Sequence, residues 1–170
     1  MLTAQDLLRT TAKLFRPPPK LTISEWADTY RQLSPEASAE VGQWRTSRTP
    51  YLKEIMDAIN TCEKVVVMSS SQVGKTEILL NAIGFFMSQD PCPIMLLEPT
   101  IEMSETISKD RIAPMLRDTP ALNGLVGKRR SKDSENTILH KSYPGGHLTL
   151  AGANSSASLA SRPIRNLFID

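Results

Sequence analysis

The stretch that decides the fold is Val65-Val66-Val67-Met68 followed by Ser69-Ser70-Ser71-Gln72-Val73-Gly74-Lys75-Thr76. Its first part is a short apolar run rich in β-branched side chains, which is typical of a strand buried on both faces of a parallel sheet. The remainder matches the phosphate-binding pattern GxxxxGK[ST] at Gly74, Lys75 and Thr76, whereas Ser69 replaces the first glycine. In such a loop the backbone N–H groups face the phosphates, the lysine reaches the outer phosphates and the hydroxyl joins Mg²⁺.

The residues after the loop agree with this interpretation. Lys75 to Ser88 is apolar nearly all round, which predicts a helix packed against a sheet, with its N-terminus facing the phosphates. From average composition, a GK[ST] string occurs by chance in roughly one chain in twelve of this length, so the flanking elements carry most of the argument. The competing interpretation makes Lys75 a solvated residue in the first turn of a helix.

Further along the chain, strand and helix patterns alternate. Ile94 to Leu97 reads as a second buried strand, and Thr100 to about Asp118 as a helix that Pro114 kinks or shortens. Alternating strands and helices predict a parallel sheet flanked by helices. The last strand is Leu167 to Ile169.

A hairpin is predicted before that last strand. Asn136 to Ser142 and His147 to Ala151 are strand candidates on either side of Tyr143-Pro144-Gly145-Gly146, where Pro followed by Gly specifies a type II turn. We therefore predict an α/β fold of the P-loop NTPase type with a β-hairpin insertion.

The N-terminal part is predicted to be helical and separate. Thr3 to Phe15 has helical spacing and ends at Pro17-Pro18-Pro19, so residues 1–20 form a helical arm with a stiff linker and residues 21–170 form the ATPase domain. We expect a helix over Glu25 to Arg31 capped by Ser24, then a loop over Ser34 to Gly42. A further helix runs from Pro50 to about Asn60, with the apolar stripe Leu52, Ile55, Met56 and Ile59.

Composition sets broad limits. The chain has 170 residues, is 40% hydrophobic and has a formal charge of +2, so any DNA-binding surface must be a local patch. Cys62 and Cys92 fit no zinc spacing, and we expect both to be reduced thiols in the core. No apolar run is long enough to cross a membrane and no signal-peptide core is present, which favours a soluble intracellular protein without a membrane partner.

Leu167-Phe168-Ile169-Asp170 has the form of a Walker B strand, whose terminal aspartate holds Mg²⁺. The order of P-loop strand, second strand and Walker B strand is that of NTPases in which a separate glutamate activates water, the ASCE type. That glutamate would directly follow Asp170. We therefore expect a domain truncated after the Walker B strand, with the general base outside this sequence.

Several stretches together resemble the gpA-type large terminase subunit of lambda-like tailed bacteriophages. They are Glu25-Trp26-Ala27-Asp28, Leu33-Ser34-Pro35-Glu36, Gly42-Gln43-Trp44, Pro50-Tyr51, Ile55-Met56, the loop with its helix (SSSQVGKTEILLN), Leu97-Glu98-Pro99-Thr100, Ala113-Pro114 and Ser161-Arg162-Pro163-Ile164-Arg165. The resemblance implies an ATP-hydrolysing motor domain that packages double-stranded DNA into a capsid. It also implies a C-terminal nuclease domain, which we expect to be absent from these 170 residues, and a site of action in the host cytoplasm.

The resemblance also implies roles for residues and partners. Ser69 to Thr76 would hold ATP, Thr76 and Asp170 would place Mg²⁺, and Tyr51 lies where the family keeps an aromatic near adenine, although Leu52 replaces the glutamine that often follows it. Core packing of Tyr51 is the alternative. The implied partners are double-stranded DNA, the small terminase subunit bound through the N-terminal arm, the portal and procapsid, and further copies of the chain in the motor.

The remaining charged candidates have two interpretations each. Arg162 and Arg165 are arginine-finger candidates or ordinary surface arginines, and Glu98 senses nucleotide or simply precedes a helix. The densest basic cluster follows a DNA backbone or is a solvated loop; it comprises Lys128, Arg129, Arg130 and Lys132. His140 and His147 share a face of the hairpin without an evident third ligand, so we read them as ordinary hairpin residues.

Two other functions remain open from the sequence. A helicase-type DNA translocase is one, because Leu97-Glu98-Pro99-Thr100 resembles the corresponding helicase segment. The other is a fragment that binds nucleotide or a partner protein without turnover. Residues beyond Asp170 and the dependence of ATP hydrolysis on Lys75 would separate these functions.

Overall fold

The computed structural model describes residues 20–127, 136–154, 159–160 and 162–170. Its main sheet has the strand order β4-β5-β3-β6, with β3 at Ile94–Glu98, β4 at His140–Tyr143, β5 at Gly146–Gly152 and β6 at Asn166–Ile169. β3 pairs in parallel with both β5 and β6, and β4 pairs antiparallel with β5. The fold is therefore mixed α/β with a parallel core, as the sequence predicts.

The hairpin is confirmed, and its second strand is a member of the main sheet. β4 and β5 meet at a turn in which Gly145 has φ +86°, the left-handed value that a type II turn requires at this position. Leu148 and Leu150 of β5 are buried, and this strand lies between β4 and β3 in the sheet. The predicted insertion thus supplies one of the parallel strands as well as the antiparallel edge.

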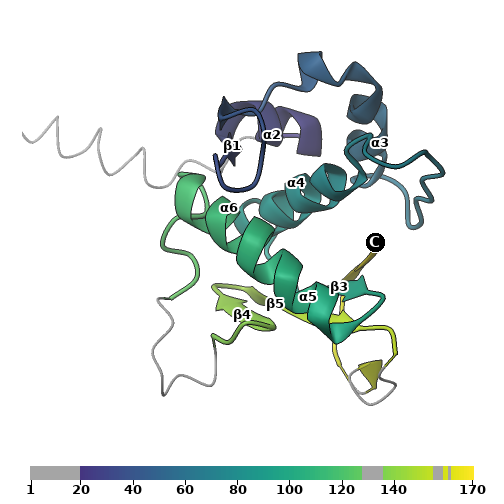
Figure 1. The fold of residues 1–170 in the computed structure, drawn as a ribbon, viewed down its shortest axis with the longest axis vertical. Coiled ribbons are helices and arrows are strands. Elements are labelled where there is room, and N and C mark those ends of the chain that lie inside the picture. The colour runs from purple at the N-terminus through teal and green to yellow at the C-terminus, as the bar shows by residue number, and fades with distance from the viewer. Residues whose placement is uncertain (1–19, 128–135, 155–158, 161) are drawn as a thin grey trace, which may run out of the picture.

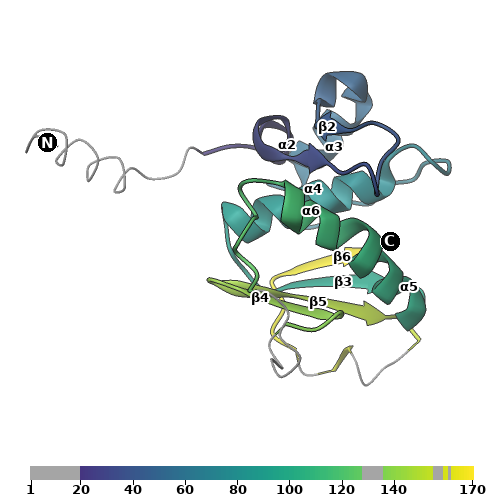
Figure 2. The same ribbon diagram turned by 60° about the vertical axis from the view of Figure 1, so that its left-hand side comes forward.

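One helical layer lies against the sheet (Figure 2). Helix α4 (Lys75–Ser88) has the predicted bounds and is buried on most sides, with Phe86 packing on Phe168 of β6 at a ring centroid distance of 6.3 Å. Helix α5 (Ile101–Ile107) follows β3, and Thr100 caps it by accepting a hydrogen bond from the Met103 N–H. Apolar α4 side chains and the sheet form the core.

Pro114 does not end the predicted helix over residues 100–118. A π-helical turn, η3 (Ser108–Ile112), directly precedes α6 (Ala113–Asp118), so the helix continues through the proline. Proline has no N–H and its ring collides with the carbonyl group of residue i−4, here Asp110. That residue lies inside the wider turn, which relieves the collision.

The N-terminal elements pack on the other side of α4. Helix α2 (Ile23–Tyr30) begins two residues earlier than predicted, and its cap is Thr22 instead of the predicted Ser24, because Thr22 and Glu25 form a capping box. A small antiparallel pair joins β1 (Gln32–Leu33) to β2 (Gly42–Gln43), so the predicted loop over Ser34 to Gly42 is essentially their connection. Short helices follow: η1 (Thr46–Arg48), η2 (Pro50–Leu52) and α3 (Lys53–Ala58).

The prediction of a buried strand over Val65 to Met68 is wrong. The segment is in no strand and is largely exposed, with Val66 at 75% and Met68 at 95% of full exposure. A strand persists only where a neighbour takes up its N–H and C=O groups. None of the described strands lies beside this segment, which forms the open connection between α3 and α4 (Figure 1).

Cys92 is buried as expected, but Cys62 is exposed, so the expectation of two core thiols is wrong for Cys62; both are free. None of the helices in the described residues is long and apolar enough to span a membrane. The predicted N-terminal arm and the basic cluster at residues 128–132 lie outside the described residues.

Candidate nucleotide site

The glycine-lysine-threonine string begins helix α4. Gly74 has φ +91° and forms the N-cap of the helix, a left-handed conformation that a side chain disfavours. Gln72 also has a positive φ, +59°, whereas Ser69 does not, so serine in place of the first glycine meets no conformational obstacle. The Lys75 ammonium donates to the Ser70 carbonyl oxygen at 3.2 Å and so closes the loop on itself.

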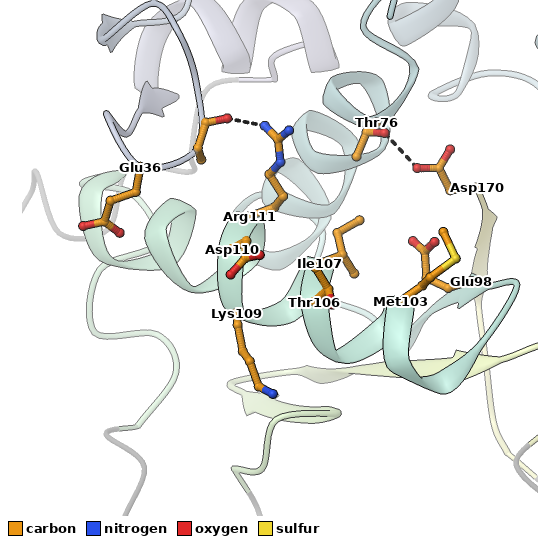
Figure 3. Close-up of a pocket in the computed structure, with 11 residues that line it drawn as sticks. Glu36, Thr76, Glu98, Met103, Thr106, Ile107, Lys109, Asp110, Arg111 and Asp170 are labelled. Carbon is orange, nitrogen blue, oxygen red and sulfur yellow. Dashed lines mark hydrogen bonds between the residues drawn. The ribbon is translucent and has the colours of Figure 1, made fainter. Parts of the chain in front are cut away.

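The hydroxyl of this string meets the predicted Walker B residue. Thr76 Oγ1 donates to the Asp170 carboxylate at 2.8 Å, a contact between residues far apart in sequence (Figure 3). The Asp170 N–H donates to the Leu97 carbonyl oxygen at 3.1 Å, which continues the pairing of β6 with β3 and fixes Asp170 at the carboxyl end of the sheet. The sequence predicted these two residues as one site, and they are adjacent.

Glu98 completes the group at this end of the sheet. It is the last residue of β3, is only 4% exposed, and its Oε1 finds no hydrogen-bond partner among the described residues. Burial, and secondarily the negative charge of Asp170, raise the pKa of Glu98. Figure 3 shows the Glu98 and Asp170 carboxylates facing the same space.

These side chains line a pocket of about 590 Å³ between β3, β6, α4 and the α5–η3 helix. Thr76, Glu98 and Asp170 lie at one end of it. At the other end Arg111 of η3 donates a hydrogen bond to the Ala37 carbonyl oxygen (Figure 3). The pocket therefore has two acids, Glu98 and Asp170, near the N-terminus of α4, and both basic and acidic side chains towards η3.

Glu77 holds the first turn of α4 in place. Its carboxylate lies 3.3 Å from Nη2 of Arg31 and 3.7 Å from Nη1 of Arg111. Arg31 is 3% exposed; burial lowers the pKa of Arg31, which the Glu77 charge opposes. Sequence reasoning missed all three residues, and the one signal was an acidic residue in the first turn of a helix.

A second, apolar hollow of about 150 Å³ is lined by loop residues Ser69 and Val73 and by Lys75. Tyr51 lines it together with Val67, Val73 and Lys75. The Tyr51 hydroxyl donates to the Val73 carbonyl oxygen at 3.3 Å, and the side chain is 57% exposed. Tyr51 is thus next to the loop and outside the core.

The two candidate arginines lie elsewhere on the surface. Arg165 forms a two-pronged ion pair with Asp90, at 3.0 and 2.6 Å, which agrees with its interpretation as a surface arginine. Arg162 is exposed, is not among the residues lining the acidic pocket, and contributes to lowering the pKa of His140, after burial and His147.

The two histidines are diagonal neighbours across β4 and β5, as predicted. Their ring centroids are 5.3 Å apart. His140 Nδ1 also lies 3.1 Å from Thr149 Oγ1, so the His140 ring has a hydrogen-bond partner within the hairpin.

The acidic pocket offers a magnesium ion few protein ligands of its own. The described residues contain no cluster of three or more His, Cys, Asp or Glu side chains arranged to hold a metal alone. Mg²⁺ in nucleotide sites takes one or two carboxylates, with the remaining ligands from phosphates and water. A threonine hydroxyl and a carboxylate in contact fit that smaller requirement.

Fold and site thus define a mixed α/β domain with hydroxyl and carboxylate groups gathered where a helix N-terminus meets the carboxyl ends of parallel strands. Residues 38–170 match the family model described as phage terminase large subunit gpA, ATPase domain. The chain belongs to this family. The family's ATPase activity implies that the domain uses nucleotide.

One curated relative agrees with this assignment. The terminase, large subunit, of Enterobacteria phage P21 is 29% identical to the chain over 131 residues, which is 76% of this chain and 20% of that protein. The chain therefore spans about a fifth of the length of that relative. No solved structure matches the chain.

Proposed function

We propose that this domain binds ATP with Mg²⁺ at Ser69 to Thr76 and hydrolyses it to drive packaging of double-stranded DNA into a phage capsid. The observation that carries the nucleotide site is the Thr76–Asp170 hydrogen bond. It brings the hydroxyl of the loop and the acid of the last strand together at the N-terminus of α4. That arrangement supports a phosphate-bound cation at this position.

Each residue of the site has a proposed role. Backbone N–H groups of Ser69 to Gly74 and the start of α4 would bind phosphate oxygens, because a helix N-terminus favours anions. Lys75 would exchange its contact with the Ser70 carbonyl oxygen for the outer phosphates. Thr76 and Asp170 would hold Mg²⁺, which would neutralise charge on the phosphates.

Tyr51 is the candidate for the base. The apolar hollow beside the loop has an aromatic ring at its mouth, and an exposed tyrosine gives a flat surface for stacking. The adenine would then lie on the Tyr51 side of α4 and the metal on the Asp170 side. An arginine from a neighbouring copy, for which Arg162 is the candidate, would complete the site in an assembled motor.

The packaging role rests on family membership. The partners that follow from it are double-stranded DNA bound without sequence specificity, the small terminase subunit, the portal of the procapsid, and further copies of the chain. The N-terminal arm is the proposed contact for the small subunit, and the host cytoplasm the proposed place of action.

Equilibrium binding of a fluorescent ATP analogue tests the nucleotide site. Lys75→Ala should weaken binding by at least about tenfold, because the lysine's charge-assisted contacts with phosphate are lost. Lys53→Ala, on the first turn of α3, removes the same charge outside both hollows and should leave affinity unchanged. Equal affinity of the wild type and Lys75→Ala would refute the site.

A further inference from the structure

We infer that Glu98 is a third protein group of the magnesium site, holding the cation jointly with Thr76 and Asp170 through its coordinated water. This inference rests on the proposed nucleotide function and extends it to a residue on a different strand. The Walker motifs contain only the other two residues.

Strand register sets the position of Glu98. Leu97 of β3 is paired with Ile169 of β6, so the next pair in the same parallel register is Glu98 with Asp170. Residues opposite one another in a parallel pair project to the same face of the sheet. The two carboxylates therefore face the same side, beneath the N-terminus of α4, as Figure 3 shows.

The Glu98 carboxylate is buried and lacks a partner among the described residues. Glu98 is only 4% exposed, and its Oε1 accepts no hydrogen bond. No cationic side chain of the described residues pairs with it. A buried carboxylate without a partner is costly, and a second acid beside it raises the cost. A divalent cation is the ligand that offsets both charges.

One continuous pocket is lined by Thr76, Glu98 and Asp170. Thr76 and Asp170 are in hydrogen-bonding contact, and Glu98 faces the same space. A cation held by that pair and by the phosphates would therefore lie on the side of the pocket that Glu98 faces. Hydroxyl and carboxylate oxygens are the ligands that Mg²⁺ prefers, and its retained waters need acceptors such as a carboxylate. Glu98 is suited to accept from such a water.

The test separates metal binding from nucleotide binding in the whole chain. The dissociation constant of a fluorescent, non-hydrolysable ATP analogue is measured in EDTA and in Mg²⁺, and the ratio of the two constants reports the coupling of metal to nucleotide. The test variant is Glu98→Gln, which keeps the shape of the side chain. The matched control is Glu102→Gln, an exposed acid in the first turn of α5 that does not line the pocket.

We expect Glu98→Gln to reduce the coupling ratio by about fivefold or more while affinity in EDTA stays within about twofold of the wild type. The control should match the wild type in both conditions. In EDTA the melting temperature of Glu98→Gln should be higher than that of the wild type, because a buried unpaired charge is gone. Asp170→Asn should also reduce the coupling ratio. In the double variant with Glu98→Gln and Asp170→Asn, the fold-reduction of the coupling ratio should be smaller than the product of the two single fold-reductions.

An unchanged coupling ratio in Glu98→Gln, with wild-type binding intact, would overturn the inference and leave the proposed function standing. A lower melting temperature together with weaker binding in EDTA would identify Glu98 as a structural residue and also overturn it. If the wild type bound the analogue no better than Lys75→Ala in either condition, the proposed function itself would fall, and the Glu98 inference with it.

Discussion

At the residue scale, Gly74 combines a backbone requirement with a packing requirement. Its φ of +91° is in the left-handed region, and a Cβ there would lie 3.1 Å from Cδ1 of the buried Leu52. We expect Gly74→Ala to lower the free energy of unfolding by about 2 kcal/mol, from the backbone conformation and the crowded methyl together. Urea denaturation followed by circular dichroism measures it.

Gly124 is the matched control for this prediction. Its φ is +84°, yet a Cβ there meets nothing within 4 Å, so Gly124→Ala carries the backbone cost alone. That cost is about 1 kcal/mol. The difference between the two variants measures the contact with Leu52, and equal losses would mean that Leu52 moves aside freely.

At the element scale, the contact of α2 with α4 depends on Gly84 of α4, which packs against the Trp26 ring of α2. Trp26 is fully buried, and a Cβ on Gly84 would lie 2.3 Å from its Cη2 atom. Gly84→Ala should therefore cost about 2 kcal/mol or more of unfolding free energy, although alanine favours a helix by about 1 kcal/mol. Denaturant unfolding monitored by circular dichroism provides the measurement.

Trp26→Phe in the Gly84→Ala background tests the cause of that loss. The smaller ring leaves room for the methyl group, so the two substitutions should be non-additive, with the double variant more stable than the sum of the single losses predicts. Strict additivity would show that Gly84 is needed for a reason other than the tryptophan.

The link between β1 and α6 gives an acid-sensitive element. Ser34 donates to the Asp118 carboxylate at 2.5 Å, and hydrogen bonds, first from Arg117 and then from Ser34, hold the pKa of Asp118 at about 2, below its ordinary 3.8. The unfolded chain takes up this proton at higher pH than the folded chain does. The stabilisation is thus complete above about pH 5 and is lost as the pH falls towards 2.

Asp118→Asn should consequently lower the free energy of unfolding at pH 7 by about 1 kcal/mol, a value reduced for the partial exposure of the side chain. It should also flatten the fall in stability between pH 5 and 2, measured by denaturation at a series of pH values. Glu36→Gln, which removes only an exposed partner of Arg117, should change stability by less than about 0.5 kcal/mol. If the stability of Asp118→Asn still fell as steeply between pH 5 and 2 as that of the wild type, Asp118 would not be the cause of the acid sensitivity.

Sequence patterns predicted correctly those elements whose stabilising features, such as an apolar surface or a cap, lie within the segment itself. Helix α4 was predicted to the residue because its apolar surface and its glycine N-cap both lie within the segment. The Val65 to Met68 strand failed because a strand depends on a neighbour, and hydrophobicity does not report whether one is present. The Thr76–Asp170 pair was predicted from motifs, whereas the Arg31–Glu77–Arg111 cluster depends on tertiary packing alone.

At the scale of the whole molecule, β6 forms an edge of the main sheet. Within the described residues β6 pairs only with β3, and its Leu167 and Ile169 are 53% and 65% exposed. The exposed Val66 and Met68 add apolar surface before the loop Ser69 to Thr76. An unpaired strand edge with exposed apolar side chains is a template for association.

We therefore expect the 170-residue chain to self-associate as its concentration rises, with the mass measured by size-exclusion chromatography and light scattering. Ile169→Lys should shift that association to higher concentration by about tenfold, because a lysine on an edge strand opposes pairing with a second chain. Val41→Lys is the matched control: Val41 is also 65% exposed but belongs to no strand of the main sheet. An equal shift in both variants would assign the effect to net charge, and a monomeric wild type at every concentration would show that the β6 edge is protected.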